Sequence, residues 1–470
     1  MQERFNEKKE IEKALNYSTK DGIAATVAGG SGDNFVSAYA VSLGATNFQL
    51  GLLSALPTLI PVELFTPKAM EKFSRKKIVL VGVLIQILMY IMIAGIGLLL
   101  FKSPTIAVTL LIALFTIHCS TGLFISPAWN SWMKDLTEKI HIGKYFGARN
   151  KIFGITSIIT IILAGLILDK FKEAGYVFLG FTTLFLIAAM GRTISRHYLK
   201  KQYEPKLKLK KDYYFSFWEF IKKTPTNNYG RFALFIALLI FSVNIAAPFF
   251  TPYMLKVLKF DYFTFTLINL VISGTANLLT MPLWGKFIDK YGCVRTMAVT
   301  VWAIPFVPLL WVISPSVYWL ALVQVISGIV WAGFNLASGT FTYVAVSKER
   351  MNLCIAYISI LNGFAVFLGA TIGGILASLN ITFMNIFLFV FIVSGIARIL
   401  VIAPLFSQIK EVKPVKPAKP ILKIIWKPIK EFLASSLTII HYNHAYKKRF
   451  KPLVNTSQNK NSRSFRNNSR

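Results

Sequence analysis

A single carboxylate interrupts the first apolar stretch of the chain that is long enough to cross a membrane. The string AGGSGDNF at 28–35 places Asp33 and Asn34 directly after three glycines and a serine. Counted from Lys20 at about 1.5 Å per helical residue, Asp33 lies about 20 Å along the helix, near the middle of a ~30 Å hydrocarbon core. An acid at that depth costs at least a few kcal/mol unless it is paired, hydrated or protonated. The position therefore suits binding of a proton, a cation or a cationic group of a solute.

Asp33 belongs to a stripe of small and polar residues that repeats at helical spacing. The stripe consists of Gly22, Thr26, Gly29, Asp33, Ser37, Ala40 and Gly44. Such a stripe packs closely on other helices or lines a cavity. Two interpretations stay open: Asp33 binds a coupling ion or solute, or it is a hydrogen-bonded acid that positions helices. Each glycine costs about 1 kcal/mol of helix stability relative to alanine, so we also predict a bend beside the acid.

The composition indicates that the whole chain is built to span a membrane. Of its 470 residues 54% are hydrophobic and only 15% are charged, and the mean hydropathy is +0.56. We predict an all-α membrane protein with twelve transmembrane helices. The predicted spans cover 21–43, 47–67, 78–101, 105–128, 152–168, 175–191, 232–255, 264–284, 296–313, 317–344, 354–378 and 381–406.

The basic residues predict the orientation of these spans. Nearly all of the 52 Lys and Arg fall in the two tails and in alternate loops, whereas the opposite loops hold only Lys102, Lys170, Lys172, Lys256 and Lys259. Basic loops stay in the cytoplasm, so we expect a multi-pass protein of the cell (plasma) membrane with both termini cytoplasmic. The net charge of +32 then reflects this bias and a basic tail, and it predicts no nucleic-acid partner.

The predicted spans divide the chain into five parts. These are a cytoplasmic N-tail (1–20), an N-terminal six-helix bundle (21–191), a cytoplasmic linker (192–231), a C-terminal six-helix bundle (232–406) and a basic cytoplasmic tail (407–470). In the linker, 211–223 predicts either a short helix in the membrane interface or a disordered segment. In the tail, 421–440 predicts contact with anionic lipid, because nearby lysines are attracted to it.

The two bundles repeat a short loop motif. PKAMEKFSRKK at 67–77 and GKFIDKYGCVR at 285–295 occupy the same slot in each half, after the second span. In both strings an acid is followed by a base, an aromatic residue, a small residue and further bases. A parallel repeat of this kind occurs in transporters built from two equal helical bundles.

The string at 285–295 resembles the loop signature of the major facilitator superfamily, G-x-x-x-D-(R/K)-x-G-x-x-(R/K). The string at 67–77 resembles it with Pro67, Glu71 and Ser74 as departures. The first span and its turn look like a group of poorly characterised prokaryotic members, which supplies no substrate. The resemblance implies a secondary transporter that rocks between inward-open and outward-open states. It also implies a gating role for the loop residues, which are Glu71, Lys72, Arg75, Gly285, Asp289, Lys290, Gly292 and Arg295.

The resemblance also implies that spans one, four, seven and ten line a central cavity. Their polar or aromatic mid-span residues are candidates for contact with a small polar solute or coupling ion. Beside Asp33, they are Asn34, Ser37, His118, Asn244, Gln324, Trp331 and Asn335. His118 could relay protons, because histidine titrates near neutral pH. For each residue taken singly, an ordinary interhelical hydrogen bond is an equal alternative.

Two functions remain open at this stage. The first is a secondary active transporter of a small solute, coupled to a proton or another cation through Asp33. The second is a facilitator-fold protein that moves or senses lipid, acting through its basic tail. We expect no enzyme, cofactor or metal site, because the sequence has no catalytic constellation, metal spacing or phosphate loop. We expect a monomer, and we predict neither the substrate nor the direction of transport.

Overall fold

The computed structural model describes residues 2–100, 102–137, 142–205, 217–224, 226–346 and 351–412. They form helices and connecting turns with no strand, which confirms the predicted all-α fold class. The first half contains α1 (Gln2–Ser31), α2 (Val36–Ser42), α3 (Asn47–Leu59), α4 (Thr66–Lys72), α5 (Arg75–Leu99), α6 (Pro104–Thr137), α7 (Ile142–Glu173) and α8 (Val177–Lys201). The second half contains α9 (Phe217–Lys223), α10 (Asn228–Asn244), α11 (Phe250–Pro252), α12 (Tyr262–Thr266), α13 (Ser273–Tyr291), α14 (Cys293–Val301), α15 (Phe306–Ile313), α16 (Val317–Ala345), α17 (Met351–Leu376) and α18 (Ile386–Leu405).

Eleven helical segments among the described residues are long and apolar enough to cross a membrane. They match eleven of the twelve predicted spans. The segment predicted at 21–43 does not qualify, because its glycines and its two polar residues, Asp33 and Asn34, lower its hydropathy. It is nevertheless helical: it is formed by the end of α1, a single 3₁₀ turn and α2.

Several helices extend beyond the predicted spans. The predicted N-tail is largely the first part of α1, which continues without interruption into the first span. The segment predicted as a linker from 192 begins inside α8, which runs to Lys201. Of the predicted interfacial segment 211–223, the described part is α9. The tail predictions fall almost entirely on 413–470, which lies outside the described residues.

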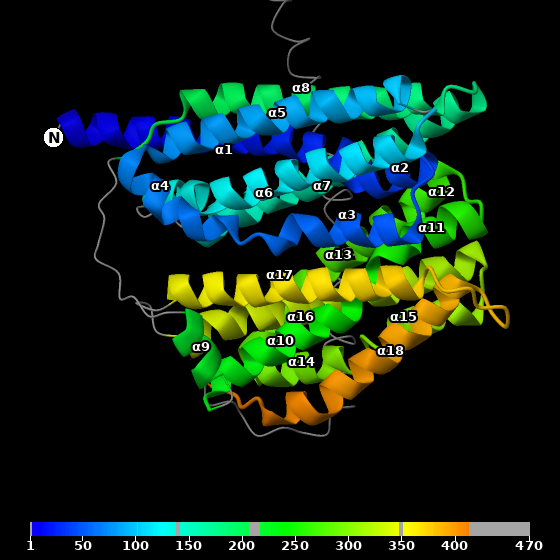
Figure 1. Cartoon of the computed structure of the whole chain (residues 1–470). Helices are drawn as coiled ribbons and strands as arrows, with labels where there is room; N and C mark the ends of the chain where they lie inside the picture. Colours follow the sequence, from blue (N-terminus) through cyan, green and yellow to red (C-terminus); the bar gives the residue numbers. More distant parts are fainter. Residues whose placement is uncertain are drawn as a thin grey trace, which may run out of the picture.

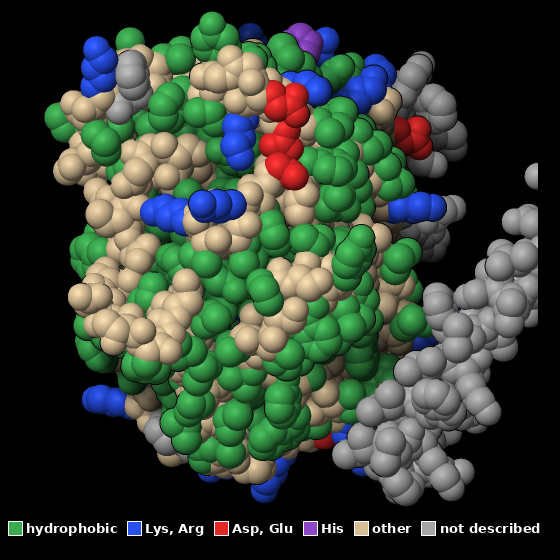
Figure 2. All heavy atoms as spheres, turned by 90° about the vertical axis from the view of Figure 1, so that its right-hand side faces the viewer, with side chains coloured by type: hydrophobic (Ala, Val, Ile, Leu, Met, Phe, Trp, Pro, Cys, Tyr) green, Lys and Arg blue, Asp and Glu red, His purple; other side chains and the backbone are tan. Residues whose placement is uncertain are grey.

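The long helices run roughly parallel and form two groups (Figure 1). Helices α1–α8 lie in the upper part of the view and most of α10–α18 in the lower part. The N-terminus of α1 marks one end of the molecule, which we call the proximal end. The opposite end, the distal end, carries the connections at 43–46, 102–103, 174–176, 258–261, 314–316 and 377–385. Figure 2 looks onto the distal end, where hydrophobic side chains cover much of the face.

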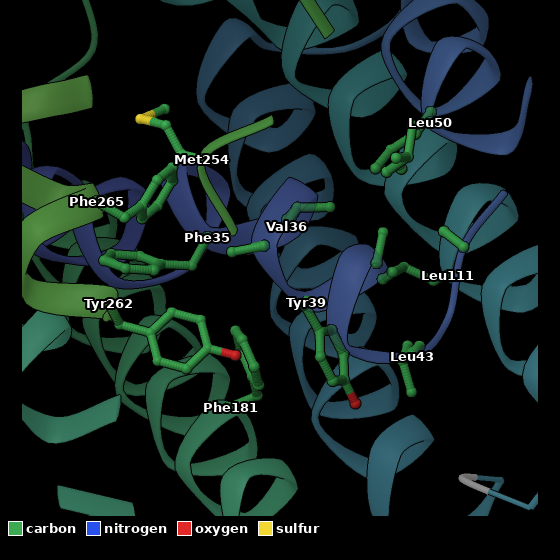
Figure 3. Packing of buried hydrophobic residues seen from close by; sticks show 14 of the residues in the cluster. Phe35, Val36, Tyr39, Leu43, Leu50, Leu111, Phe181, Met254, Tyr262 and Phe265 are labelled. Carbon is green, nitrogen blue, oxygen red and sulfur yellow. The ribbon is translucent and has the colours of Figure 1, made fainter. Parts of the chain in front are cut away.

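Both halves contribute to one hydrophobic core toward the distal end. In Figure 3, Tyr262 and Phe265 of α12 lie beside Phe35 and Phe181 of the first half. The Phe181 and Tyr262 rings meet edge to face, with 5.6 Å between their centroids. The buried cluster continues from there into α2, α3, α5 and α6 on one side and into α15, α16 and α18 on the other. Burial of this shared apolar surface holds the two halves together at the distal end.

Toward the proximal end each half has a hydrophobic core of its own. One cluster includes Ile78, Trp132 and Leu199 and contains only residues of the first half. A second cluster includes Phe232 and Phe341 and contains only residues of the second half. The buried cluster that both halves share therefore lies toward the distal end.

The first membrane-spanning segment of each half, which begins with α1 or α10, is interrupted at a comparable place. The α-helical run stops after Ser31 in the first half and after Asn244 in the second, and a 3₁₀ turn follows each break. In the first half, Gly32 favours the break because glycine is unfavourable inside a helix. In the second half, Pro248 favours it because proline has no amide hydrogen to donate within the helix. The bend predicted beside Asp33 thus coincides with a break in the helix.

Carbonyl groups freed near the second break are satisfied from α18. Ser394 donates a 2.6 Å hydrogen bond to the carbonyl of Ser242, and Arg398 donates to the carbonyls of Val243 and Ile304. Arg398 is 2% exposed. Ser394 and Arg398 thus supply donors beside the break, and Arg398 also binds the turn between α14 and α15 through Ile304.

Candidate functional site

Asp33 lies at the break between α1 and α2, within reach of two buried side chains. Tyr90 on α5 donates a 2.7 Å hydrogen bond to Oδ1 of Asp33, and Nε2 of His118 on α6 lies 3.3 Å from the same oxygen. Tyr90 is 1% exposed and His118 is 4% exposed, whereas the Asp33 side chain is 44% exposed. The two aromatic rings stack obliquely, 4.3 Å apart. Asp33 is therefore held from one side and open on the other.

The local backbone makes this arrangement sterically feasible. A Cβ on Gly32 would lie 2.8 Å from the Tyr90 ring and 3.0 Å from the carbonyl oxygen of Ala28. Glycine at this position therefore lets Tyr90 approach the helix closely enough to reach the acid. Gly32 thus serves both the break and the contact between Tyr90 and Asp33.

A chain of polar contacts continues from the Asp33 site toward the proximal end. Gln86, one turn before Tyr90, donates to the carbonyl of His118 and accepts a hydrogen bond from Arg192 on α8. Arg192 also donates to Ser195, at 3.5 Å, and Ser195 donates to the carboxylate of Asp21. Polar side chains inside the first half thus join α1, α5, α6 and α8.

Of the predicted candidates, Asp33 and His118 are brought together. Asn34 and Ser37 lie on the same chain segment as Asp33, and both are partly exposed. The predicted candidates did not include Tyr90, Gln86 and Arg192. The four-residue spacing of Gln86 and Tyr90 was an available signal, because it places two polar groups on one face of an apolar span.

The four candidates of the second half are not joined to the Asp33 site by a hydrogen bond or ion pair. Asn244 donates to the carbonyl of Ile240 within its own helix. Gln324 is buried, and Trp331 packs edge to face on Phe334. Asn335 is exposed. These positions remain predictions of solute contact.

The motif residues have two different environments. Glu71, Lys72, Asp289 and Lys290 are exposed, and the two acids make no hydrogen bond or ion pair with a described residue. Gly285 is partly buried on α13, and Arg295, partly buried on α14, has interaction partners. Gly292 has a φ of 90° at the end of α13, a conformation that favours glycine. The motif segments 67–77 and 285–295 are helical, except at Phe73–Ser74 in the first and at Gly292 in the second.

Arg75 is the buried member of the first motif. It is fully enclosed and binds Asp135 at 2.6 Å, the carbonyl of Ser131 at 3.0 Å and the carbonyl of Pro205 at 2.7 Å. Glu204 lies 3.5 Å away. All of these partners belong to the first half or to the segment that follows it. In this conformation Arg75 ties α5, α6 and the end of α8 together.

No group of three or more His, Cys, Asp and Glu that could hold a metal ion occurs in the described part of the chain. The Asp33–Tyr90–His118 cluster offers one carboxylate, one hydroxyl and one imidazole. Such groups can accept, release and pass on a proton.

The sequence and the fold both resemble those of known membrane transporters. The sequence model of the Major Facilitator Superfamily matches residues 22–299 and 232–449. Among solved structures, a mutant of the nucleoside transporter NupG superposes with a TM-score of 0.68 at 14% identity, covering 84% of this chain and all of the other. A D-xylose–proton symporter gives 0.64 at 12% identity, covering 86% of this chain and 99% of its own.

A bacterial homologue of the iron transporter ferroportin, in an inward-facing state, gives a TM-score of 0.63 at 15% identity and covers 85% of this chain and 99% of its own. A search among curated proteins found no significant match. At these identities the structural likeness concerns the fold.

Proposed function

The chain belongs to the major facilitator superfamily, and from this premise we propose that it is a secondary active transporter of a small solute whose coupling proton or cation binds at Asp33. The observation that carries the proposal is the contact of Asp33 with Tyr90 and His118 at the break in the first span. A carboxylate facing lipid would be strongly disfavoured. The exposed side of Asp33 therefore suits a water-filled space between helices.

The cluster has the parts that a coupling site needs. The carboxylate can bind a proton or a cation, and His118 can exchange a proton with it across 3.3 Å. The buried Nδ1 of His118 has no hydrogen-bond partner among the described residues.

The asymmetry of the hydrophobic cores supports alternating access. The halves share a core at the distal end and have separate cores at the proximal end. A conformation closed at the distal end is one of the two that such a cycle requires. With the proximal end in the cytoplasm, as the basic loops predict, this conformation corresponds to an inward-facing state. We place the protein in the cell membrane on the same ground.

The structural neighbours suggest which solutes to try first. They are a nucleoside transporter, a D-xylose–proton symporter and a bacterial homologue of an iron transporter. We propose a thermal-unfolding screen of purified protein against nucleosides, sugars, amino acids, organic acids and cationic compounds, at pH 5.5 and 7.5. Ligands that bind the folded state raise the unfolding temperature in proportion to their occupancy. Positive compounds then go to counterflow assays in proteoliposomes, with Asp33→Asn beside the unaltered protein.

Coupling through Asp33 predicts that solute exchange survives in Asp33→Asn, whereas accumulation driven by a proton or cation gradient is lost. Gradient-driven accumulation that persists in this variant would refute the role of Asp33. A protein that binds no solute but is stabilised by anionic lipid would favour the lipid-sensing alternative through 407–470.

A further inference from the structure

A second polar site lies inside the first half, between the Asp33 cluster and the proximal end. It is a cavity of about 380 Å³ formed by α1, α5, α6, α7 and α8. Its charged lining residues are Asp21, Arg149 and Arg192, and its aromatic lining residues are Trp129 and Phe153. None of these residues belongs to the cluster around Asp33.

Arg149 is held by aromatic rings and not by acceptors. Its guanidinium lies 4.9 Å from the ring centre of Trp129 and 4.3 Å from that of Phe153. It makes no hydrogen bond or ion pair within the described part of the chain, and its Nε is buried without a partner. Aromatic faces attract a guanidinium and orient it without using its N–H donors. The donors of Arg149 are therefore available to a ligand.

The charge of the cavity wall favours an anion. Two guanidinium groups, those of Arg149 and Arg192, face one carboxylate, that of Asp21. Asp21 accepts a hydrogen bond from Ser195, and Arg192 donates to Gln86 and Ser195. One positive charge remains without a matching acid in the wall. In a cavity of low polarity such an excess attracts an anionic group.

We propose that this cavity binds the carboxylate or phosphate group of a small organic solute, with Arg149 as the main donor. The planar fork of an arginine matches two oxygens of such a group. The volume is within the range of small-molecule sites, and the rings of Trp129 and Phe153 provide an apolar wall for the rest of the solute. The inference rests on the proposed transport function and specifies its substrate class as organic anions.

The cavity adjoins the coupling site along one helix face. Gly22 and Thr26 line it, and they belong to the same stripe of α1 as Gly29 and Asp33. On α6, Gly122 lines the cavity one turn after His118. A solute bound at Arg149 would therefore contact α1, and an ion bound at Asp33 would lie at the break where α1 ends.

The test measures thermal unfolding of the purified full chain in neutral detergent with benzoate and phenyl phosphate. Benzamide is the uncharged control probe, and phosphatidylglycerol tests a lipid headgroup as the source of the anion. The variants are Arg149→Gln, which removes the charge, and Arg149→Lys, which keeps it without the fork. Arg196→Gln is the matched control, because Arg196 lies one turn after Arg192 on α8, binds the carbonyl of Leu80 and does not line the cavity.

We expect at least one soluble anion to stabilise the protein while benzamide does not. The half-saturating concentration should rise at least tenfold in Arg149→Gln, rise less in Arg149→Lys, and stay unchanged in Arg196→Gln. Equal binding by Arg149→Gln, no effect of either anion, or a response to phosphatidylglycerol alone would overturn the proposal.

The two proposals can fail separately. If gradient-driven solute flux were unchanged in Arg149→Gln, the proposed anion site would be refuted and the proposed transport function would stand. If anions bound in an Arg149-dependent way but no flux occurred in proteoliposomes, the anion site would stand and the proposed transport function would be refuted.

Discussion

Tyr90 donates a 2.7 Å hydrogen bond to the Asp33 carboxylate from a position on α5 that is itself fully buried. The donor comes from the third predicted span and the acceptor from the first. This bond fixes the acid at the helix break and occupies one of its oxygens, Oδ1. Anything that binds at Asp33 must share that oxygen, take the other, or displace the tyrosine.

We predict that Tyr90→Phe tightens binding of the coupling proton or cation. The substitution keeps the ring and removes the donor, and a hydrogen bond to a charged group contributes about 1.5–3 kcal/mol. The ion concentration at half-maximal flux should therefore fall about tenfold or more, as measured in proteoliposomes. Tyr39→Phe is the control, because it removes a buried hydroxyl on α2 that binds backbone groups of Ile93 and Gly97 instead. An unchanged ion dependence in Tyr90→Phe would contradict the prediction.

Asp169 of α7 links the two halves at the distal end by capping a helix of the other half. Its two oxygens accept hydrogen bonds from the amides of Tyr262 and Phe263, at 2.8 and 2.7 Å. A carboxylate at a helix N-terminus contributes about 0.3–2 kcal/mol. We predict that Asp169→Asn shifts the equilibrium several-fold toward a conformation open at the distal end.

Spin labels at the exposed positions Tyr176 and Tyr318, in a background without the three native cysteines, report this shift as longer distances. Asp261→Asn is the matched control. Asp261 caps the same helix through Thr264, but it belongs to the same half. If both variants gave the same distances, the proposed link between the halves would be ruled out.

Gly363 allows α17 to approach α3. A Cβ on Gly363 would overlap the carbonyl oxygen of Thr58, which is backbone and cannot turn aside. We predict that Gly363→Ala destabilises the protein by about 1–3 kcal/mol through overpacking. Gly339→Ala on α16 should be neutral or stabilising by about 1 kcal/mol in the same thermal-unfolding measurement, because nothing lies within 4 Å of its Cβ position and alanine favours a helix. Equal unfolding temperatures for the two variants would show that the contact is easily relaxed.

We expect Arg75 to contribute more to the stability of the folded protein than to gating. Removing one partner of a buried ion pair costs on the order of 3 kcal/mol, because the other charge is left uncompensated. We therefore predict that Arg75→Gln lowers the unfolding temperature strongly. Lys72→Gln, an exposed change in the same motif, should leave it unaltered. A variant Arg75→Gln with normal stability and slow transport would instead support a gating role.

The sequence was sufficient for the features that depend on local pattern. The apolar runs and the break at Gly32 follow from hydrophobicity and backbone preference along a single segment, so they could be predicted without tertiary information. The repeated motif at 67–77 and 285–295 likewise led to the family. Helix ends were less accurate, because α1, α7 and α8 continue past the membrane core as polar helix.

Only the tertiary structure determined which side chains meet. Tyr90 reaches Asp33, and Arg75 is enclosed by Asp135 and Pro205, because helices far apart in sequence pack with particular rotations and offsets. Arg149 was predicted to lie in a loop, yet it faces a cavity because α7 begins at Ile142, before the predicted span. Periodicity shows which residues share one helix face, but the neighbour that this face meets depends on the packing of all the other helices.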